Sequence, residues 1–444
     1  MTGNEIRQVL DAAGVRPNRQ LGQNFLCDGQ VAKWIGDQLD PQPEDTIVEV
    51  GPGTGALTEW LIGRVKRLVL IEFDSRLAEY LKSRFADNPS VEVHHADGAR
   101  FDPRVLWKYR PVKFLGNLPY SSGGAILKNF MTQPYPFTRA VIMLQKEVID
   151  RLGAQPRTKE YGVLTLRICS SWRVNSVMVV PPEAFYPAPQ IDSSVAVLEP
   201  LDGELGPFDA RRFDELLRRG FSQRRKQLRK HMPDSPPWTE VAEKLGVDET
   251  ARAEELTLQQ WVDLSRCYDD HPLSEIPQKD EEIFDVVSED DEVLGQATRK
   301  EVHEKGLIHR AVHIFVINGR GELLLQRRSL LKDMHPGVWD SSAAGHLDAG
   351  EDYVSAAVRE LEEEMGIEDV EPVEVGRIQP CPETGWEHVR LYQVRWEGTP
   401  KFPCAEVAAV LWLSPEEIDA WIASRPEDFA SGFLECWALA RGRR

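Results

Sequence analysis

The chain has 444 residues and a net charge of −19, and 41% of its residues are hydrophobic. This length predicts two or three domains, and the composition is ordinary for globular proteins. The apolar runs are far shorter than the roughly 20 residues that cross a bilayer, so we expect no association with a membrane.

The charged residues are unevenly distributed along the chain. Residues 1–270 contain 35 Lys and Arg against 37 Asp and Glu, whereas residues 271–444 contain 18 against 35. This asymmetry indicates a fusion of modules with different partners, and it leaves a nucleic-acid partner open for the first module. The six cysteines form no CxxC pair, which predicts reduced thiols in a cytoplasmic protein.

Seven short β-rich runs alternate with helical patterns between Thr46 and about Pro200. They are residues 46–50, 68–73, 91–97, 112–117, 140–144, 176–180 and 193–198. Strands that alternate with helices of about ten to fifteen residues indicate crossover units and a mostly parallel sheet. Residues 1–200 are therefore predicted to form an α/β domain.

Three further segments follow this domain. Residues 201–268 have a helical and basic pattern, which predicts a small helical domain. Residues 269–281 combine prolines with acidic residues and no periodicity, which predicts a linker. Residues 282–444 are predicted to form the last domain.

Three glycines follow the first predicted strand, in VEVGPGTGALTEWL. Gly51, Gly53 and Gly55 lie between a strand and a helix, where glycine lets the backbone approach a ligand closely. The turn alone leaves open a dinucleotide site, an S-adenosylmethionine site or a tight turn without a ligand. Glu72, which ends the second strand, suits a ribose diol, and Asp97, which ends the third, could accept the amino edge of an adenine.

The tetrapeptide Asn117-Leu118-Pro119-Tyr120 ends the fourth predicted strand. An adenine N6 is a poor nucleophile because its lone pair is delocalised into the ring. Hydrogen bonds from the amino group to the Asn117 side-chain oxygen and to the Leu118 carbonyl would push the nitrogen toward tetrahedral geometry. Tyr120 can then stack on a flipped-out base. A hydride-transfer enzyme has no use for this arrangement, which favours S-adenosylmethionine over a dinucleotide as the cofactor. The remaining alternative is a strand end with a core tyrosine and no ligand.

Residues 1 to about 268 resemble the KsgA/RsmA-type rRNA adenine N6,N6-dimethyltransferases. Seven blocks carry the resemblance: LGQNFLCD, VEVGPGTGALTEWL, GNLPY, MLQKEVIDRL, KEYGVLTL, AFYPAPQIDSSV and FSQRRKQLRK. The resemblance implies a Rossmann-like S-adenosylmethionine methyltransferase sheet with a small helical domain. It also implies dimethylation of N6 in two adjacent adenosines of a hairpin near the 3′ end of small-subunit (16S) rRNA.

The same resemblance implies the site residues of the first module. It places a second aromatic wall at Phe185, opposite Tyr120. The cofactor contacts of the family match Asn24, Leu26, Gly51, Glu72, Asp97 and Asn117, to which Gly53 of the glycine turn is added.

Nine Arg or Lys residues lie between Arg211 and Lys230, and Arg218, Arg225 and Arg229 follow helical spacing. A solvated helix face is one interpretation of this run. Beside an adenine pocket, the alternative is a surface that contacts RNA phosphates. The predicted RNA-binding residues are Arg224, Arg225, Lys226 and Arg229.

Three glutamates lie at helical spacing in GHLDAGEDYVSAAVRELEEEMGI. Glu360, Glu363 and Glu364 would crowd one helix face, where each like-charge pair costs roughly 0.2–0.5 kcal/mol. A hard divalent cation would remove this repulsion, and oxygen-only ligands beside a diphosphate favour Mg²⁺. The alternative is a solvated acidic helix.

The last domain resembles a Nudix hydrolase over about residues 281 to 440, which implies an α+β fold and hydrolysis of a diphosphate-containing small molecule. Its flanking sequences GLIHRAVHIFVINGRGELLLQRRS and HPGVWDSSAAGH look like the branch that includes isopentenyl-diphosphate isomerase. That isomerase has a cysteine where this chain has Ala344, so hydrolysis is expected rather than isomerisation. Glu406 could supply a further carboxylate. The fixed positions of the Nudix box are filled by Gly345, Glu351, Arg359, Glu360, Leu361, Glu363, Glu364, Gly366 and Ile367.

The main hypothesis is a bifunctional and monomeric protein that acts on small-subunit rRNA and on a diphosphate. Two alternatives remain for the first module. It could be a non-catalytic RNA-binding factor in ribosome assembly, or an adenine methylase of large-subunit rRNA.

Overall fold

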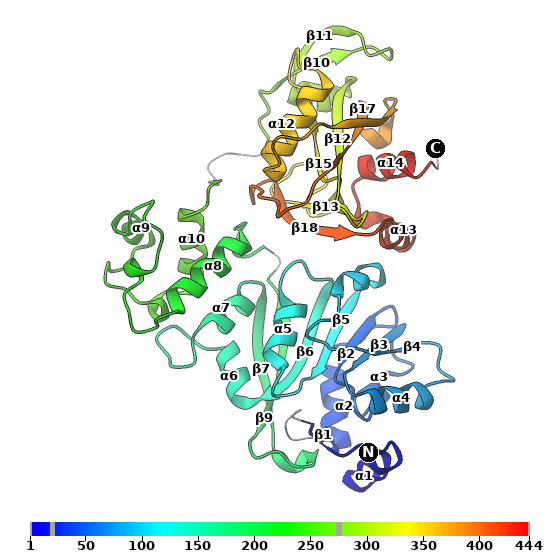
Figure 1. Cartoon of the computed structure of the whole chain (residues 1–444), viewed down its shortest axis with the longest axis vertical. Helices are drawn as coiled ribbons and strands as arrows, with labels where there is room; N and C mark the ends of the chain where they lie inside the picture. Colours follow the sequence, from blue (N-terminus) through cyan, green and yellow to red (C-terminus); the bar gives the residue numbers. More distant parts are fainter. Residues whose placement is uncertain (1, 18–22, 202, 272–277, 443–444) are drawn as a thin grey trace. The chain divides into compact units, whose positions relative to one another are not determined.

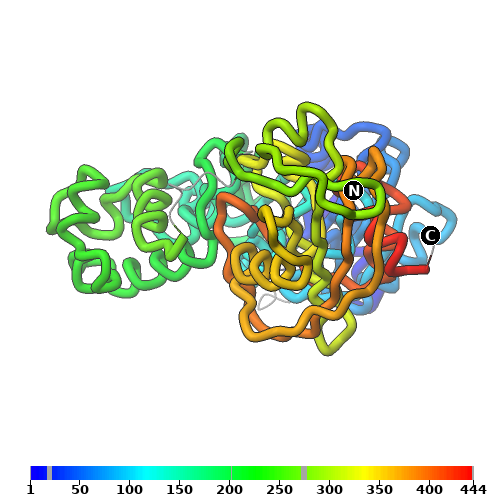
Figure 2. The backbone as a smooth tube through the Cα atoms, turned by 90° about the horizontal axis from the view of Figure 1, so that it is seen from above, coloured from blue at the N-terminus to red at the C-terminus, as the bar shows by residue number. Residues whose placement is uncertain are grey.

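The computed structural model describes residues 2–17, 23–201, 203–271 and 278–442 (Figures 1 and 2). The chain forms two compact units. Unit 1 comprises Met1–Leu205 and Ala210–Ser265, and unit 2 comprises Gly206–Asp209 and Arg266–Arg444. Residues 272–277 of the predicted linker lie outside the described residues.

Unit 1 is built on a seven-stranded sheet with strand order β4-β3-β2-β5-β6-β9-β7. Its strands β4, β3, β2, β5 and β6 are parallel, and β9 and β7 are antiparallel to their neighbours. All seven predicted strands are confirmed, as is the mostly parallel sheet. The strands are β2 (Thr46–Val50), β3 (Arg67–Glu72), β4 (Val91–His95), β5 (Val112–Asn117), β6 (Phe137–Gln145), β7 (Trp172–Val180) and β9 (Ser193–Pro200).

The sheet of unit 1 is buried because helices cover both of its faces. Residues of β2 alternate between two hydrophobic clusters, with Val48 and Val50 in one and Ile47 in the other. Parallel strands covered on both faces have continuous apolar sequences, which explains runs such as TIVEV. The helices before the helical segment are α1 (Gly3–Ala12), α2 (Gly29–Gln38), α3 (Thr58–Leu61), α4 (Ser75–Arg84), α5 (Gly123–Met131), α6 (Lys146–Leu152) and α7 (Val163–Cys169).

A two-stranded ribbon joins two distant sequence blocks. Strand β1 (Phe25–Leu26) pairs with β8 (Phe185–Tyr186), so that Leu26 lies opposite Phe185. The blocks NFL and AFYPAP, which are separated by about 160 residues, therefore meet at one place.

The helical segment of unit 1 contains α8 (Ala210–Phe221), α9 (Trp238–Leu245) and α10 (Leu258–Cys267), which form a separate group in both views (Figures 1 and 2). The helical spacing of Arg218, Arg225 and Arg229 does not correspond to one helix, because α8 ends at Phe221. Beyond it, the Leu228 N–H donates to the Ala251 carbonyl, which draws the chain out of the helix.

Unit 2 contains a second seven-stranded sheet, with the order β14-β13-β12-β17-β16, in which β15 pairs with β12 and β18 with β13. A separate hairpin is formed by β10 (Ile283–Val287) and β11 (Val293–Thr298). The sheet strands are β12 (His309–Ile317), β13 (Leu323–Arg328), β14 (Trp339–Asp340), β15 (Ala343–His346), β16 (Val373–Ile378), β17 (Glu387–Arg395) and β18 (Val407–Leu413).

The glutamate-rich sequence forms α12 (Tyr353–Met365), which packs on β15 and β12. Apolar residues such as Ala357 and Leu361 attach the helix to the sheet core at Val312 and Ile314. Gly366 ends the helix in a left-handed conformation with φ of +60°. The other helices of unit 2 are α11 (Arg299–Lys305), α13 (Pro415–Ser424) and α14 (Ser431–Ala440).

In the described part of the chain, every helix is too short or too polar to span a membrane.

Gly51 provides a test of the close approach between β2 and β5. Gly51 and Gly63 both have positive φ angles, of +74° and +76°. A Cβ at Gly51 would lie 2.8 Å from the Asn117 carbonyl oxygen, whereas one at Gly63 would have no atom within 4 Å. We expect Gly63→Ala to lower the free energy of unfolding by about 1 kcal/mol and Gly51→Ala by about 3 kcal/mol, measured by denaturant titration. Equal losses would show that the approach does not constrain the fold.

Candidate active sites

The first site is a cavity at the carboxyl ends of β2 and β5 in unit 1. The glycine turn after β2, the end of β5 and the β1–β8 ribbon all contribute to its wall. It therefore brings together residues that lie far apart in the sequence. The predicted residues that line it are Asn24, Leu26, Gly51, Gly53, Glu72, Asn117, Leu118, Pro119, Tyr120 and Phe185.

The glycine turn packs so closely against its neighbours that Gly51 and Gly53 have no room for a side chain. Gly53 has a φ of +58°, and a Cβ there would lie 2.9 Å from the Phe25 ring. Its N–H donates to Glu72 at 3.0 Å, and Glu72 also accepts from the Asp74 N–H at 2.9 Å. Burial raises the pKa of Glu72. The turn and this carboxylate therefore face the same cavity, as a bound ribose would require.

At the end of β5, the groups that face the cavity differ in their hydrogen bonding. The Leu118 N–H donates to the Met143 carbonyl at 3.1 Å, which fixes the backbone at the strand end. The Tyr120 hydroxyl is 2.7 Å from the Ser193 hydroxyl, which restrains its ring, and burial raises the pKa of Tyr120. Phe185 is 4% exposed and provides a second aromatic surface. The Asn117 amide makes no hydrogen bond to any described residue and remains available to a ligand.

Asp97 differs from the other predicted cofactor residues. It follows β4, accepts a hydrogen bond from the Ala99 N–H at 2.9 Å and lies 3.8 Å from Arg100. Its side chain is 37% exposed and does not line the cavity. The structure thus brings the other predicted residues together and leaves Asp97 outside the cavity wall.

Glu49 is a cavity residue that the sequence analysis missed. It is 1% exposed, and its Oε2 accepts from the Thr58 hydroxyl at 2.6 Å. Burial, followed by the charge of Glu72, raises the pKa of Glu49 to about 7. Its Oε1 is buried without a hydrogen-bond partner among the described residues. The sequence feature that could have predicted this residue is an acid within the apolar run TIVEV.

The four predicted RNA-binding residues divide into two groups. Arg224 donates to Glu254 at 2.5 Å and to the carbonyls of Lys159 and Thr158 at 2.6 and 2.7 Å. Its guanidinium therefore ties the segment after α8 to other parts of unit 1. The other three side chains, Arg225, Lys226 and Arg229, are exposed.

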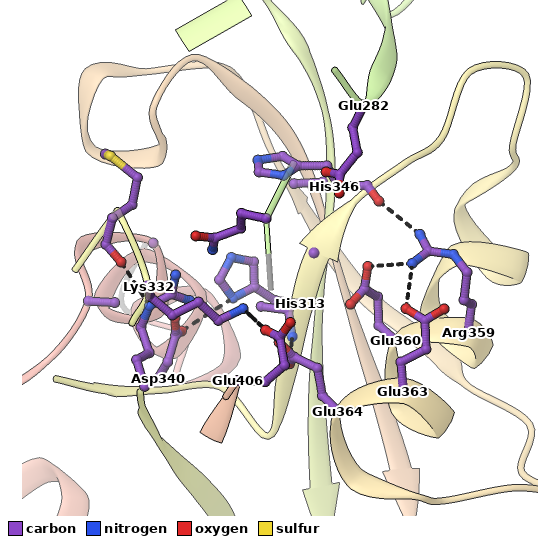
Figure 3. A pocket seen from close by; sticks show the side chains of 18 of the residues that line it. Glu282, His313, Lys332, Asp340, His346, Arg359, Glu360, Glu363, Glu364 and Glu406 are labelled. Carbon is purple, nitrogen blue, oxygen red and sulfur yellow. Dashed lines mark hydrogen bonds and ion pairs between the residues drawn. The ribbon is translucent and has the colours of Figure 1, made fainter. Parts of the chain in front are cut away.

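The second site is a cavity of about 1590 Å³ in unit 2, lined by the predicted glutamates of α12 (Figure 3). Glu360 and Glu364 are 8% and 3% exposed, whereas the Glu363 side chain is 60% exposed. Burial, followed by the charge of Glu364, raises the pKa of Glu360 to about 8. A divalent cation would relieve this buried repulsion, so these residues fit a Mg²⁺ site.

Arg359 holds the glutamates in place. It donates to Glu360 at 2.8 Å, to Glu363 at 3.1 Å and to Glu351 at 3.0 Å, and Figure 3 shows its guanidinium beside the first two. It also donates to the His346 carbonyl at 2.9 Å, which ties α12 to β15. The guanidinium of Arg359 therefore orients the carboxylates of Glu351, Glu360 and Glu363.

Strand β15 shapes the space around these carboxylates. A Cβ at Gly345 would overlap the carboxylate of Glu360, and the Ala344 N–H donates to Glu364 at 3.1 Å. Gly345 therefore lies on β15, where it admits the carboxylate, and the turn before α12 follows this strand. That turn contains Gly350, with a φ of +81°.

Lys332 is a second residue that the sequence analysis missed. It forms an ion pair with Glu406 and lies 3.5 Å from Glu364. Although burial opposes it, the charges of these two glutamates raise the pKa of Lys332. Glu406 thus lies in one cavity with the predicted glutamates, as the sequence suggested. Lys332, which bridges Glu406 and Glu364, belongs to no local sequence motif that would have predicted it.

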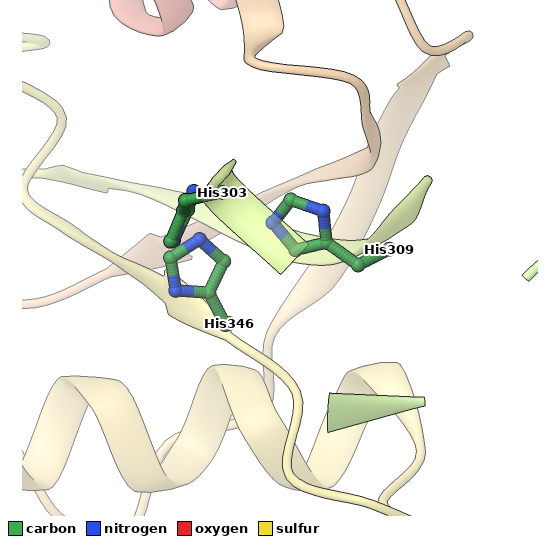
Figure 4. Close-up of side chains that lie close together, drawn as sticks. All are labelled: His303, His309 and His346. Carbon is green, nitrogen blue, oxygen red and sulfur yellow. The ribbon is translucent and has the colours of Figure 1, made fainter. Parts of the chain in front are cut away.

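Three histidines in the same cavity region form a further candidate metal-binding group (Figure 4). The ligand atoms of His303, His309 and His346 lie within 4.8 Å of one another. Glu387 is 3.1 Å from His346 and 3.5 Å from His309, and these histidines lower the pKa of Glu387 although burial opposes them. Imidazole and carboxylate ligands suit a divalent transition metal. The sequence analysis missed this group because its members are far apart in the chain.

Comparisons with known proteins match a family to each of two parts of the chain. A family model described as ribosomal RNA adenine dimethylase matches residues 14–270, and a model described as NUDIX domain matches residues 307–431. A ribosomal RNA small subunit methyltransferase A from Geobacter metallireducens is 40% identical over 264 residues, which cover 57% of this chain and 96% of that protein. The protein of the same description from Vibrio parahaemolyticus is 37% identical, over 58% of this chain and 97% of that protein.

Two solved structures are similar to part of this chain. A dimethyladenosine transferase from Plasmodium falciparum has a TM-score of 0.46 and 25% identity, over 54% of this chain and 95% of that one. DR0079 from Deinococcus radiodurans has a TM-score of 0.33 and 31% identity, over 36% of this chain and 98% of that one.

The glycine turn, the Asn117–Tyr120 strand end and the acidic helix α12 thus define a methyltransferase-type unit followed by a Nudix-type unit. The chain belongs to the ribosomal RNA adenine dimethylase family and carries a NUDIX domain in its second unit.

Gly345 tests the cation site of the second unit. We expect Gly345→Ala to abolish the Mg²⁺-dependent rise in melting temperature, because the added methyl displaces Glu360. Gly295→Ala is the control, since that strand position has a negative φ and no atom within 4 Å of an added Cβ. Differential scanning calorimetry at increasing Mg²⁺ measures the effect. An undiminished shift in Gly345→Ala would exclude Glu360 from the cation site.

Proposed function

We propose that unit 1 transfers methyl groups from S-adenosylmethionine to N6 of two adjacent adenosines in a hairpin near the 3′ end of small-subunit (16S) rRNA. The observation that carries the proposal is the free Asn117 amide at the end of β5, in one cavity with the glycine turn and two aromatic rings. The names of the relatives favour the small subunit over the large subunit as the substrate.

The residues of the strand end prepare the adenine amino group for reaction. The Asn117 side-chain oxygen and the Leu118 carbonyl accept its two hydrogen bonds, which makes the nitrogen lone pair available. Tyr120 and Phe185 stack on the two faces of the extruded base. S-adenosylmethionine, when bound, would supply an activated methyl carbon. The amino nitrogen would form the new N–C bond while the sulfonium S–C bond breaks and a neutral thioether leaves, and the cationic amino product would then lose a proton to water.

The cofactor occupies the neighbouring part of the groove in this proposal. Gly51 and Gly53 let the backbone approach it closely, and Glu72 accepts its ribose hydroxyls. Asn24 and Leu26 contact it from the β1 side, and Asp97 accepts its adenine amino group where the cofactor extends past this cavity toward the end of β4.

For unit 2, we propose Mg²⁺-dependent hydrolysis of a diphosphate joined to another group. Glu360, Glu363 and Glu364 would hold the cation, which would neutralise charge on the diphosphate and activate water. Arg359 orients these carboxylates, and Lys332 with Glu406 forms the facing side of the site. Ala344 provides no thiol, which favours hydrolysis over isomerisation although the flanking sequences resemble the isopentenyl-diphosphate isomerase branch.

The RNA surface, the compartment and the oligomeric state complete the proposal. Arg225, Lys226 and Arg229 contact RNA phosphates, with Arg224 placing the segment that carries them. The protein acts as a monomer in the cytoplasm, where its rRNA substrate is found.

A pair of substitutions separates the two activities. Asn117→Ala removes an acceptor of the adenine amino group, so we expect methyl transfer to fall at least about 100-fold while diphosphate hydrolysis is retained. Glu364→Gln removes a cation ligand and is expected to have the reverse effect. Asn175→Ala, at an exposed position of β7, is the control for the first change. Loss of both activities in either folded variant would contradict two independent sites.

The basic segment gives a second test. Arg225→Ala removes an exposed charge and is expected to weaken binding to a small-subunit rRNA hairpin and reduce the salt slope by about 1, with an unchanged melting temperature. Arg224→Ala instead removes an internal ion pair and is expected to lower the melting temperature. Filter binding at several salt concentrations measures the first effect. An unchanged salt slope in Arg225→Ala would remove this residue from the RNA surface.

A further inference from the structure

His313 is a buried side chain of the unit 2 cavity to which neither the Nudix box nor the three-histidine group assigns a role. It lies on β12 and is 6% exposed, and it lines the cavity that contains the glutamates of α12. Figure 3 shows its ring among the side chains that line this cavity.

The strand register places His313 on the same face of the sheet as Ala344 and His346. In the β12–β15 ladder, His313 is opposite Ala344, and Ala311 is opposite His346. Alternate residues of a strand share a face, and directly opposed residues lie on the same side of a sheet. The two alanines therefore leave a shallow floor, with His313 at one corner and His346 at the other.

The two ring nitrogens of His313 have different environments. Nδ1 lies 2.7 Å from the Ser341 hydroxyl and 3.9 Å from Asp340, which fixes the ring. Nε2 makes no hydrogen bond to a described residue, and it faces the position of Gly432, where a Cβ would lie 3.3 Å from it. The missing side chain at Gly432 thus leaves this nitrogen accessible from the cavity.

The cations beside this corner are already paired with carboxylates. Arg328 donates to Asp340 at 3.1 Å, and Lys332 is paired with Glu406 and Glu364. When the Ser341 hydroxyl donates to Nδ1, Nε2 carries a hydrogen, and it also does so in the imidazolium form. In either of these two forms, His313 offers an anionic ligand an uncommitted donor at Nε2.

We propose that His313 is a substrate-binding residue of unit 2, whose Nε2–H donates to the phosphoryl oxygens of the diphosphate across the Ala311–Ala344 floor. The inference rests on the proposed diphosphatase function and adds a contact outside the Nudix box. Ser341 orients the ring, and Gly432 leaves the space that the phosphoryl group enters.

The test uses methylenediphosphonate, a diphosphate analogue that resists hydrolysis, with saturating Mg²⁺ and the full chain. Isothermal titration calorimetry is expected to show binding to the parent protein and at least about tenfold weaker binding to His313→Gln, because a hydrogen bond to a charged group is lost. His388→Gln is the matched control. His388 is also 6% exposed, but its Nε2 is bonded to the Ser288 carbonyl outside the cavity lining.

A second variant keeps the imidazole and avoids a buried substitution. Gly432→Ala, in helix α14, improves helix propensity while its methyl presses on the His313 ring. We expect about threefold weaker binding of methylenediphosphonate with an equal or higher melting temperature.

The outcomes distinguish this inference from the function on which it rests. Absence of binding to the parent protein would overturn the diphosphate function itself. Parent-like affinity in folded His313→Gln would overturn only the role of His313. If His313→Gln does not fold, Gly432→Ala decides, and unchanged affinity in that variant overturns the inference.

Discussion

The close approach of two parallel strands at their carboxyl ends determines the first site. The Asn117 carbonyl oxygen lies only 2.8 Å from the position that a Cβ of residue 51 would take, so glycine allows β2 and β5 to end this close together. This contact places the cofactor turn and the adenine acceptors in one cavity. Methyl transfer requires that the two reactants be held within bonding distance, so a main-chain constraint between strands determines where the chemistry can occur.

Unit 2 uses a comparable constraint for a different purpose. The absence of a side chain at Gly345 makes room for the Glu360 carboxylate, and Arg359 holds it beside two other acids. The helix thus keeps carboxylates buried that would repel one another without a cation. In both units, a glycine on one element makes room for a polar group of another element. The fold thus holds polar groups at positions where a ligand could bind them.

Much of this architecture could be predicted from the sequence because its signals are local. Buried parallel strands are continuous apolar runs, and the acids and the tetrapeptide Asn117–Tyr120 follow them directly. The α12 glutamates were noticed from their helical spacing, and the resemblance to the Nudix box favoured a metal site over a solvated helix. In each case, neighbouring residues carry the chemistry, so the one-dimensional pattern was sufficient.

The features that the sequence did not reveal depend on contacts between distant segments. Lys332 reaches Glu364 and Glu406 from the loop between β13 and β14, and the three histidines come from β15, α11 and β12. Helical spacing wrongly grouped Arg218 with Arg225 and Arg229, because α8 ends at Phe221 and the other two residues lie beyond it. Asp97 follows its strand as expected but turns its carboxylate to the Ala99 N–H.

The most direct measurement is to incubate the protein with undermethylated small ribosomal subunits and an isotope-labelled methyl donor, and to map the modified bases by mass spectrometry. The proposed mechanism predicts two adjacent adenosines near the 3′ end of the RNA, each carrying two labelled methyl groups on N6. Label on any other atom or base, or no incorporation despite cofactor binding, would contradict the assignment of Asn117 and Leu118 as the acceptors of an adenine amino group.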